Sequence, residues 1–197
     1  MPLVVKDLAT NDGVQLLAQQ LATTCTPEQL EKIKIVVTRI LASNPQLANI
    51  PVVAQKGLNN AFYNFKRNSI TTGLLNSDVI GHELGHAINT QNSDSYQKVL
   101  LTTRGLSALE RKAAIPVMLG LKMFASDPTR KDILRTLTAA SVANAAPQLH
   151  EEASASFDAF MNSPDKIQSL KTLIPALASH TLATTWPSIA YSIAQRL

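Results

Sequence analysis

The N-terminal part of the chain shows the spacing of apolar residues that is typical of amphipathic helices. From Leu30 to Leu41 apolar residues recur every three or four positions, which predicts a helix with one buried face. Thr26-Pro27 suits the cap and first turn of this helix, Gln29 can complete a capping box, and Asn44-Pro45 is expected to end the helix. A shorter helix is expected before it, over residues 11–23.

After residue 49 the pattern changes to short runs rich in Val, Ile, Phe, Tyr and Thr, which predict strands. We expect these strands at Ile50–Gln55, Ala61–Phe65 and Ser69–Thr72. Lys66-Arg67-Asn68 separates the last two strands and is expected to form a hairpin turn. Ser77-Asp78 then suits the cap of a helix that continues to about Asn89.

The rest of the chain has helical spacing throughout. Helices are expected over residues 95–103, 107–125, 129–145, 148–162, 165–179 and 187–196. The order of helix, small sheet, helix and helical half predicts one α+β domain over residues 1–197, in which the helix after the sheet packs on the sheet. Its parts are a helical segment at 1–49, the sheet and following helix at 50–91, and a helical segment at 92–197.

Composition supports a folded chain and limits its metal chemistry. Hydrophobic residues make up 45% of the 197, which is enough for a core and excludes a disordered chain. Cys25 is the only cysteine, so no intramolecular disulfide can form and no zinc site built on paired cysteines is available. A metal ion in this chain would therefore need histidine and carboxylate ligands.

Charge and hydropathy bear on the partners and the location of the chain. The net charge is +4 and the pI about 9.3, but the 18 Lys and Arg residues form no basic block, so no nucleic-acid partner is expected. A mild attraction to anionic lipid is left open. Thr172–Ala194 is uncharged and of spanning length, but its prolines and hydroxyl residues favour a buried helix pair. The N-terminus lacks a signal-peptide pattern, and a cytoplasmic or peripheral membrane location is expected.

The strongest chemical signal is the run Ile-Gly-His-Glu-Leu-Gly-His-Ala-Ile over residues 80–88. His82 and His86 lie four positions apart, so a helix presents both rings on one face, where they can bind the same ion. Glu83 lies next to that face and can take a proton from a water molecule that zinc has made more acidic. The alternative is a polar helix face without metal, but two buried histidines would then be poorly satisfied.

A catalytic zinc ion needs a third protein ligand. The candidates are His150, Glu151, Glu152, Asp158 and His180. We favour Glu152, because the residues on its helix face are small enough for a second helix to pack closely. These small residues are Ala155, Ser156 and Ala159. Ser156, one turn after Glu152, is expected to hydrogen-bond a metal ligand, and Glu151 is the next choice for the third ligand.

These motifs resemble those of the gluzincin zinc metallopeptidases over about residues 50–160. Asn60-Ala61-Phe62, Gly73-Leu74-Leu75 and the His-Glu-Leu-Gly-His helix resemble the CAAX prenyl protease and HtpX-like peptidases. Glu152-x-x-Ala155-Ser156-x-x-Ala159, together with Gly85-His86-Ala87-Ile88, is similar instead to the YugP-like neutral zinc metallopeptidases. The soluble minigluzincins are a third relative, and the choice among these branches stays open.

The resemblance implies a mostly helical zincin-like fold, a Zn²⁺ cofactor and an endopeptidase that acts on a peptide or protein substrate. It also implies that Glu152 is the third ligand and that Glu83 is the general base. In these families an edge strand of the small sheet holds the substrate, and the matching residues here are Asn60, Ala61 and Phe62.

Three features depart from the family pattern. Ser156 stands where the prenyl protease group has Asp, and Thr185-Trp186-Pro187 stands where the HtpX-like enzymes have Thr-His-Pro. His180 or Tyr191 could replace that histidine in stabilising the oxyanion. The interval Asn89–Glu151 carries too many charges to span a membrane, unlike the same interval in those families.

Two other functions stay open from the sequence. The departures from the family pattern motivate a zinc-binding relative with little activity, which would serve as a binding or scaffold module. The basic pI and the uncharged Thr172–Ala194 motivate a helical protein on a membrane surface.

Overall fold

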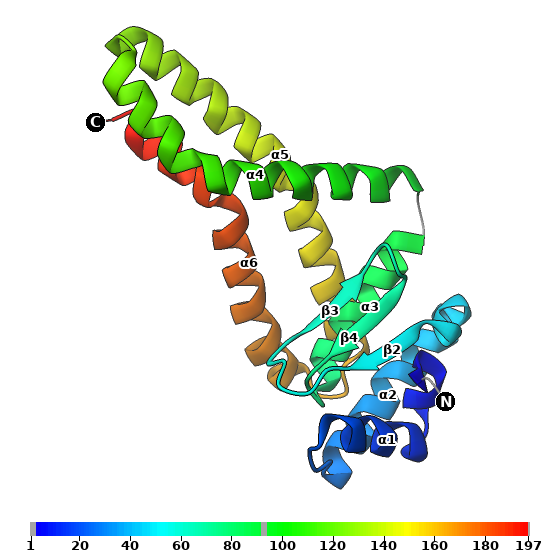
Figure 1. The fold of residues 1–197 in the computed structure, drawn as a ribbon. Coiled ribbons are helices and arrows are strands. Elements are labelled where there is room, and N and C mark those ends of the chain that lie inside the picture. The colour runs from blue at the N-terminus through cyan, green and yellow to red at the C-terminus, as the bar shows by residue number, and fades with distance from the viewer. Residues whose placement is uncertain (1–2, 92–93, 197) are drawn as a thin grey trace. The chain divides into compact units, whose positions relative to one another are not determined.

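The computed structural model describes residues 3–91 and 94–196 and has the expected α+β class, mostly helical with a small sheet near the N-terminus (Figure 1). The chain forms two compact units. Unit 1 comprises Met1–Asp94 and Glu152–Leu177, and unit 2 comprises Ser95–Glu151 and Ala178–Leu197. Two helices, α5 (Asp127–Asn162) and α6 (Lys166–Ala194), contribute to both units. The single domain over residues 1–197 therefore stays a prediction.

Unit 1 begins with helices α1 (Asn11–Leu21) and α2 (Pro27–Ser43) and two short 3₁₀ helices, Val5–Ala9 and Pro45–Asn49. The capping box predicted at the start of α2 is confirmed. The Thr26 hydroxyl accepts a hydrogen bond from the Gln29 backbone N–H at 3.1 Å, and the Gln29 side chain accepts one from the Thr26 N–H at 3.0 Å. The capping pair fixes where α2 begins, before its apolar face enters the core.

The sheet of unit 1 has four strands in the order β1-β2-β4-β3. Their bounds are Leu3–Val4 for β1, Pro51–Ala54 for β2, Ala61–Asn64 for β3 and Ser69–Thr72 for β4. β2 runs parallel to β4, whereas β1 with β2 and β3 with β4 are antiparallel. The predicted hairpin turn between β3 and β4 is confirmed, with Asn68 at a φ of 46° and its side chain accepting a 2.6 Å hydrogen bond from the Tyr63 hydroxyl. The order makes β3 an edge strand.

Helix α3 (Ser77–Gln91) packs on this sheet as predicted, with contacts to β3 and β4 and to α2. Ile80, Leu84 and Ala87 face the core of unit 1. The predicted cap at Ser77-Asp78 is wrong by one residue. The Asn76 side chain accepts hydrogen bonds from the N–H groups of the second and third helical residues, at 2.9 and 3.2 Å, because Asn76 lies just outside the helix, where an N-cap must lie.

Unit 2 is built from long helices: α4 (Asp94–Phe124), most of α5 and the last part of α6. Its core is small and centres on Ala114, Leu134 and Tyr191. The six shorter helices predicted after residue 94 are three continuous ones. α5 runs through Pro147, where we expected a break, because one lost backbone hydrogen bond does not outweigh the cooperative pairing of the turns on either side.

The buried helix pair predicted for Thr172–Ala194 is also wrong. This segment is part of the continuous helix α6, and Ile174, Leu182 and Ile193 on it are 58%, 64% and 55% exposed. Within residues 3–91 and 94–196, no helix is both long and apolar enough to cross a membrane.

Candidate metal centre

The two histidines of α3 form the first part of the candidate site. Their rings lie edge to face, with centroids 4.6 Å apart and planes at 80°. This arrangement follows from their spacing of one helical turn, which aims both side chains away from the core face of α3. His86 is buried and His82 nearly so, and the rings therefore lie in a largely water-excluded position.

Two glycines of α3 allow the second helix of the site to approach. A Cβ added to Gly85 would lie 2.7 Å from the Ala155 Cα in α5, and one added to Gly81 would lie 3.4 Å from the Ala159 Cα. Since the residue numbers rise along one helix and fall along the other, α5 runs antiparallel to α3. The close packing expected for the small-residue face of α5 is confirmed, and it brings Glu152 to the histidines.

The Glu152 carboxylate lies close enough to both histidines for the three side chains to bind one metal ion. Its Oε2 is 3.3 Å from Nε2 of His82 and 3.6 Å from Nε2 of His86, and one potential ligand atom from each residue lies within 4.8 Å of the others. Tetrahedral ligands at about 2.0–2.1 Å from a zinc ion are separated from each other by about 3.3–3.4 Å. The three residues can therefore hold a metal ion.

A contact behind His82 supports this assignment. The Ser156 hydroxyl lies 3.2 Å from Nδ1 of His82. When Nδ1 donates to the hydroxyl, the neutral ring directs the lone pair of Nε2 toward the Glu152 carboxylate. In that tautomer Nε2 and the carboxylate can both bind one metal ion. The predicted contact between Ser156 and a candidate ligand is present.

Glu83 lies beside the three residues and is only 4% exposed. Burial raises the pKa of its carboxyl above the usual range. The nearby His86 and His82, and a hydrogen bond from the Tyr63 backbone, lower this pKa but do not cancel the effect of burial, and Glu152 adds to the rise. Among the described residues no group hydrogen-bonds to Oε2 of Glu83, so this oxygen is available to a reacting proton.

Strand β3 lies on the Glu83 side of α3 and ends the sheet. The Tyr63 backbone hydrogen-bonds to Glu83, so the backbone N–H and C=O groups of Tyr63 point away from β4 and toward the site. Backbone orientation alternates along a strand, so the backbone groups of Ala61, two residues earlier, point the same way. Phe62 points to the other face of the sheet, where it is 43% exposed and lines a shallow hollow. The Asn60 carbonyl already accepts a 2.9 Å hydrogen bond from the Gly73 N–H. Of the three predicted substrate-binding residues, Ala61 has the placement that fits the role best.

Among the described residues, none of the other candidates for the third ligand belongs to the group whose potential ligand atoms lie within 4.8 Å of one another. Glu151 is fully buried in unit 2, where it hydrogen-bonds to Tyr96 and helps to raise the pKa of the Tyr96 hydroxyl, although burial contributes more. The Tyr96 hydroxyl is also 3.0 Å from Nδ1 of His150. His180 is exposed on the unit 2 part of α6, and its role in stabilising an oxyanion stays a prediction. Tyr191 is 1% exposed and packs in the core of unit 2. Its role in stabilising an oxyanion also stays a prediction.

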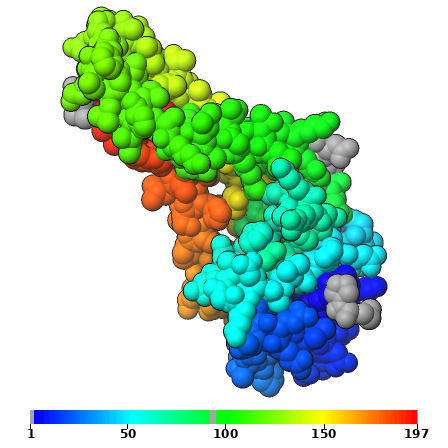
Figure 2. All heavy atoms as spheres, in the orientation of Figure 1, coloured from blue at the N-terminus to red at the C-terminus, as the bar shows by residue number. Residues whose placement is uncertain are grey.

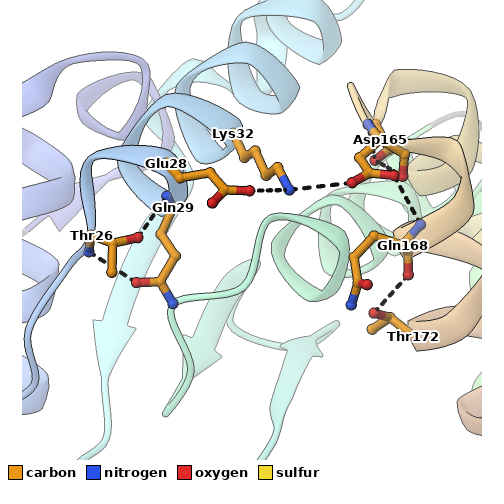
Figure 3. A network of polar contacts seen from close by, with 8 residues as sticks. Thr26, Glu28, Gln29, Lys32, Asp165, Gln168 and Thr172 are labelled. Carbon is orange, nitrogen blue, oxygen red and sulfur yellow. Dashed lines mark hydrogen bonds and ion pairs between the residues drawn. The ribbon is translucent and has the colours of Figure 1, made fainter.

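A polar network that sequence spacing does not reveal ties α5 and α6 to α2 within unit 1 (Figure 3). Lys32 pairs with Glu28 at 2.8 Å and with Asp165 at 3.4 Å, 133 residues away in the chain. Asp165 also accepts a 3.0 Å hydrogen bond from the Gln168 N–H, which is the main cause of the lowered pKa of its carboxyl. Arg39 bonds to the carbonyl of Asn162 at 3.2 Å. These contacts hold the end of α5 beside α2 and so help to fix the helix that carries Glu152.

Comparison with known proteins gave no significant match to a family model, a curated protein or a solved structure.

Proposed function

We propose that the chain is a zinc-dependent endopeptidase of the gluzincin type, in which His82, His86 and Glu152 bind zinc and Glu83 is the general base. The observation that supports it most is the group of two imidazoles and one carboxylate whose potential ligand atoms lie within 4.8 Å of one another. Structural zinc sites use four protein ligands, whereas catalytic sites use three and keep one position open. A three-ligand set next to a buried carboxyl favours catalysis over a purely structural site.

Zinc at this position would supply Lewis acidity toward a water molecule and a substrate carbonyl. The protein's own contribution centres on Glu83. Its Oε2 takes a proton from the attacking water and then delivers it to the departing amide nitrogen. Burial, by raising the pKa of this carboxyl, makes it a stronger base and keeps the transferred proton out of bulk water. Ser156 holds the His82 ring in one orientation through its hydroxyl.

The edge strand β3 supports a mode of substrate binding. A peptide in extended form can add to an exposed sheet edge through backbone hydrogen bonds, which gives affinity with loose side-chain preference. The outward backbone groups of Ala61 are the candidates for these bonds. The proposed substrate is therefore an unstructured stretch of peptide or protein.

The test combines metal analysis of the purified full-length chain with hydrolysis of an unfolded protein such as casein. We expect one zinc ion per chain and measurable cleavage. Glu83→Gln should retain the zinc and lose activity by about 10²–10⁴-fold, because the amide cannot accept the proton of water. Glu31→Gln, on the exposed side of α2 in an ion pair with Lys34, is the matched control and should change neither measurement.

Equal turnover in the parent chain and in Glu83→Gln would contradict the proposed role of Glu83. A chain that binds stoichiometric zinc but cleaves nothing would instead match the binding or scaffold module. A chain without zinc would refute both.

A further inference from the structure

The positive charge of the chain is concentrated in one of its two units. Unit 2 contains nine Lys and Arg residues against four Asp and Glu, a net charge of +5, whereas unit 1 contains nine against ten, a net charge of −1. The basic excess, which looks evenly spread along the sequence, therefore belongs to the helical unit alone. Such an asymmetry between units indicates an acidic partner for unit 2.

The same unit exposes a row of large apolar side chains on α4. Ile115, Leu119 and Met123 follow one another at intervals of four residues, which places them on one helix face, and they are 53%, 57% and 72% exposed. Phe124, at the end of the helix, is 85% exposed. We call these four residues the α4 stripe. In Figure 2 α4, in green, lies at the surface of unit 2. A contiguous row of this kind marks an interaction site more often than a chance exposure.

The charged residues within the helical segment that carries the α4 stripe are all positive. Residues 111–124 include Arg111, Lys112 and Lys122 and contain no Asp or Glu. Lys112 and Lys122 are exposed, and neither forms an ion pair with any residue in the part of the chain that the structure describes. Lys112 lies three residues before Ile115, on the same side of the helix. The surface thus combines an apolar row with unneutralised cations at both ends.

We propose that the α4 stripe docks on an anionic lipid surface. The four apolar side chains enter the boundary between headgroups and acyl chains, and Lys112 and Lys122 bind lipid phosphates beside them. A helix that lies in the interface combines exposed apolar side chains with lysines that reach the headgroups, and it does not need the length or hydropathy of a spanning helix. The proposal does not depend on peptidase activity.

Two other occupants fit the α4 stripe less well. A nucleic acid would be attracted by the lysines but would leave the apolar row in water. A second copy of the chain, related by a two-fold axis, would bring the same cationic surface against itself and so oppose like charges. An anionic bilayer satisfies both the charge and the apolar row.

The experiment is co-sedimentation of the full-length chain with large unilamellar vesicles. Vesicles of mixed phosphatidylglycerol and phosphatidylcholine should bind the chain, vesicles of phosphatidylcholine alone should bind it far less, and high salt should release it. Leu119→Glu/Met123→Glu should weaken binding by about tenfold or more, because charged side chains oppose insertion. Ile167→Glu is the control, since Ile167 is an equally exposed apolar residue on α6 in unit 1, and its binding should equal that of the parent chain.

A second pair of variants tests how much the charges of Lys112 and Lys122 contribute to vesicle binding. Lys112→Glu/Lys122→Glu should also weaken binding to anionic vesicles by about tenfold or more. Lys6→Glu/Lys56→Glu makes the same change of charge on exposed positions of unit 1 and should have a much smaller effect. The proposal is overturned by absence of binding to anionic vesicles, or by equal loss in stripe and control variants. It is also overturned if the chain is a dimer in solution that Leu119→Glu/Met123→Glu dissociates, since the stripe would then be a protein interface.

Discussion

Gly85 in α3 lies so close to Ala155 in α5 that a Cβ on the glycine would be 2.7 Å from the Ala155 Cα and 2.8 Å from its carbonyl oxygen. Both of these atoms belong to backbone, so no side-chain rotation can relieve the contact. The helix that carries the two histidines and the helix that carries Glu152 are therefore positioned by a direct backbone contact at a glycine.

Gly85→Ala should consequently disturb the candidate metal site although Gly85 binds nothing. We expect a loss of about 1–3 kcal/mol in the free energy of unfolding, as for other overpacked positions, together with weaker zinc binding. The matched control is Gly105→Ala in α4, where an added Cβ would meet no described atom within 4 Å apart from the local backbone of its own helix. That variant should gain about 0.5–1 kcal/mol, because alanine favours a helix interior. Thermal unfolding with and without zinc measures both effects.

Glu152→Ala and Glu151→Ala should separate the two adjacent glutamates. Removing Glu152 leaves two imidazole ligands, so zinc affinity should fall sharply while the fold is retained. Removing Glu151 breaks its hydrogen bond to Tyr96 in unit 2, so stability should fall with little change in zinc affinity. Competition with a colorimetric chelator gives the affinities, and the opposite ranking would show that Glu151 is the ligand.

Ser156→Ala tests the contact behind His82. Loss of the hydroxyl at 3.2 Å from Nδ1 frees the ring to rotate, and zinc affinity should fall by about 10–100-fold, the usual range for such orienting contacts. Ser154→Ala, two residues earlier in α5, removes a 3.3 Å contact to Asn89 and should leave zinc affinity nearly unchanged. Equal affinities in the two variants would rule out an orienting role for Ser156.

The buried hydroxyl of Tyr63, in the β3–β4 hairpin, makes the free energy of unfolding depend on pH in the alkaline range. Burial raises the pKa of its hydroxyl from the ordinary value of 10.0 to about 12. Below pH 10 both states keep the proton. Above it the unfolded chain ionises while the folded chain does not, so stability is lost as the pH rises from 10 to about 12. Tyr63→Phe should remove this loss, which amounts to about 1.4 kcal/mol between pH 10 and pH 11, at the cost of the 2.6 Å bond to Asn68 at neutral pH. Urea unfolding between pH 8 and 11 checks the slope, which should be shallower than in the parent chain.

Removal of either histidine should abolish tight zinc binding. In His82→Ala or His86→Ala two protein ligands remain, too few for a stable site. His180→Ala, on exposed surface of unit 2, is the control for loss of a histidine and should retain one zinc per chain. Stoichiometric zinc in a variant that lacks both His82 and His86 would place the metal elsewhere.

Local signals allowed much of the fold to be predicted. Thr26, Gln29 and Asn68 act within five residues of their partners, so their caps and turns could be predicted from spacing alone. The two-residue strand β1 was missed, because it exists only through pairing with β2, far along the chain. The end of α2 at Asn44-Pro45 was predicted correctly. The breaks expected within α4, α5 and α6 were wrong, since the cooperativity of a long helix is not visible in a few residues.

The residues of the candidate site also differ in whether local sequence spacing predicts them. His82, Glu83 and His86 were identified because their chemistry depends on spacing within one helix. Glu152 was chosen from five candidates, on the size of the residues that follow it and on the resemblance to a family motif. The pair of Lys32 and Asp165, which helps to anchor α5, could not be found from sequence, because no pattern relates two charges 133 residues apart.

Unit 1 is interrupted in the sequence, since the chain leaves it after Asp94 and returns at Glu152. During synthesis at about 5–20 residues per second, roughly 3–13 seconds pass between the translation of His86 and that of Glu152. Throughout this interval the nascent chain contains both histidines but lacks the Glu152 carboxylate, and a metal ion would be held only weakly. The cluster therefore assembles late, after the intervening helices have been translated, and a truncated product ending within them cannot complete it.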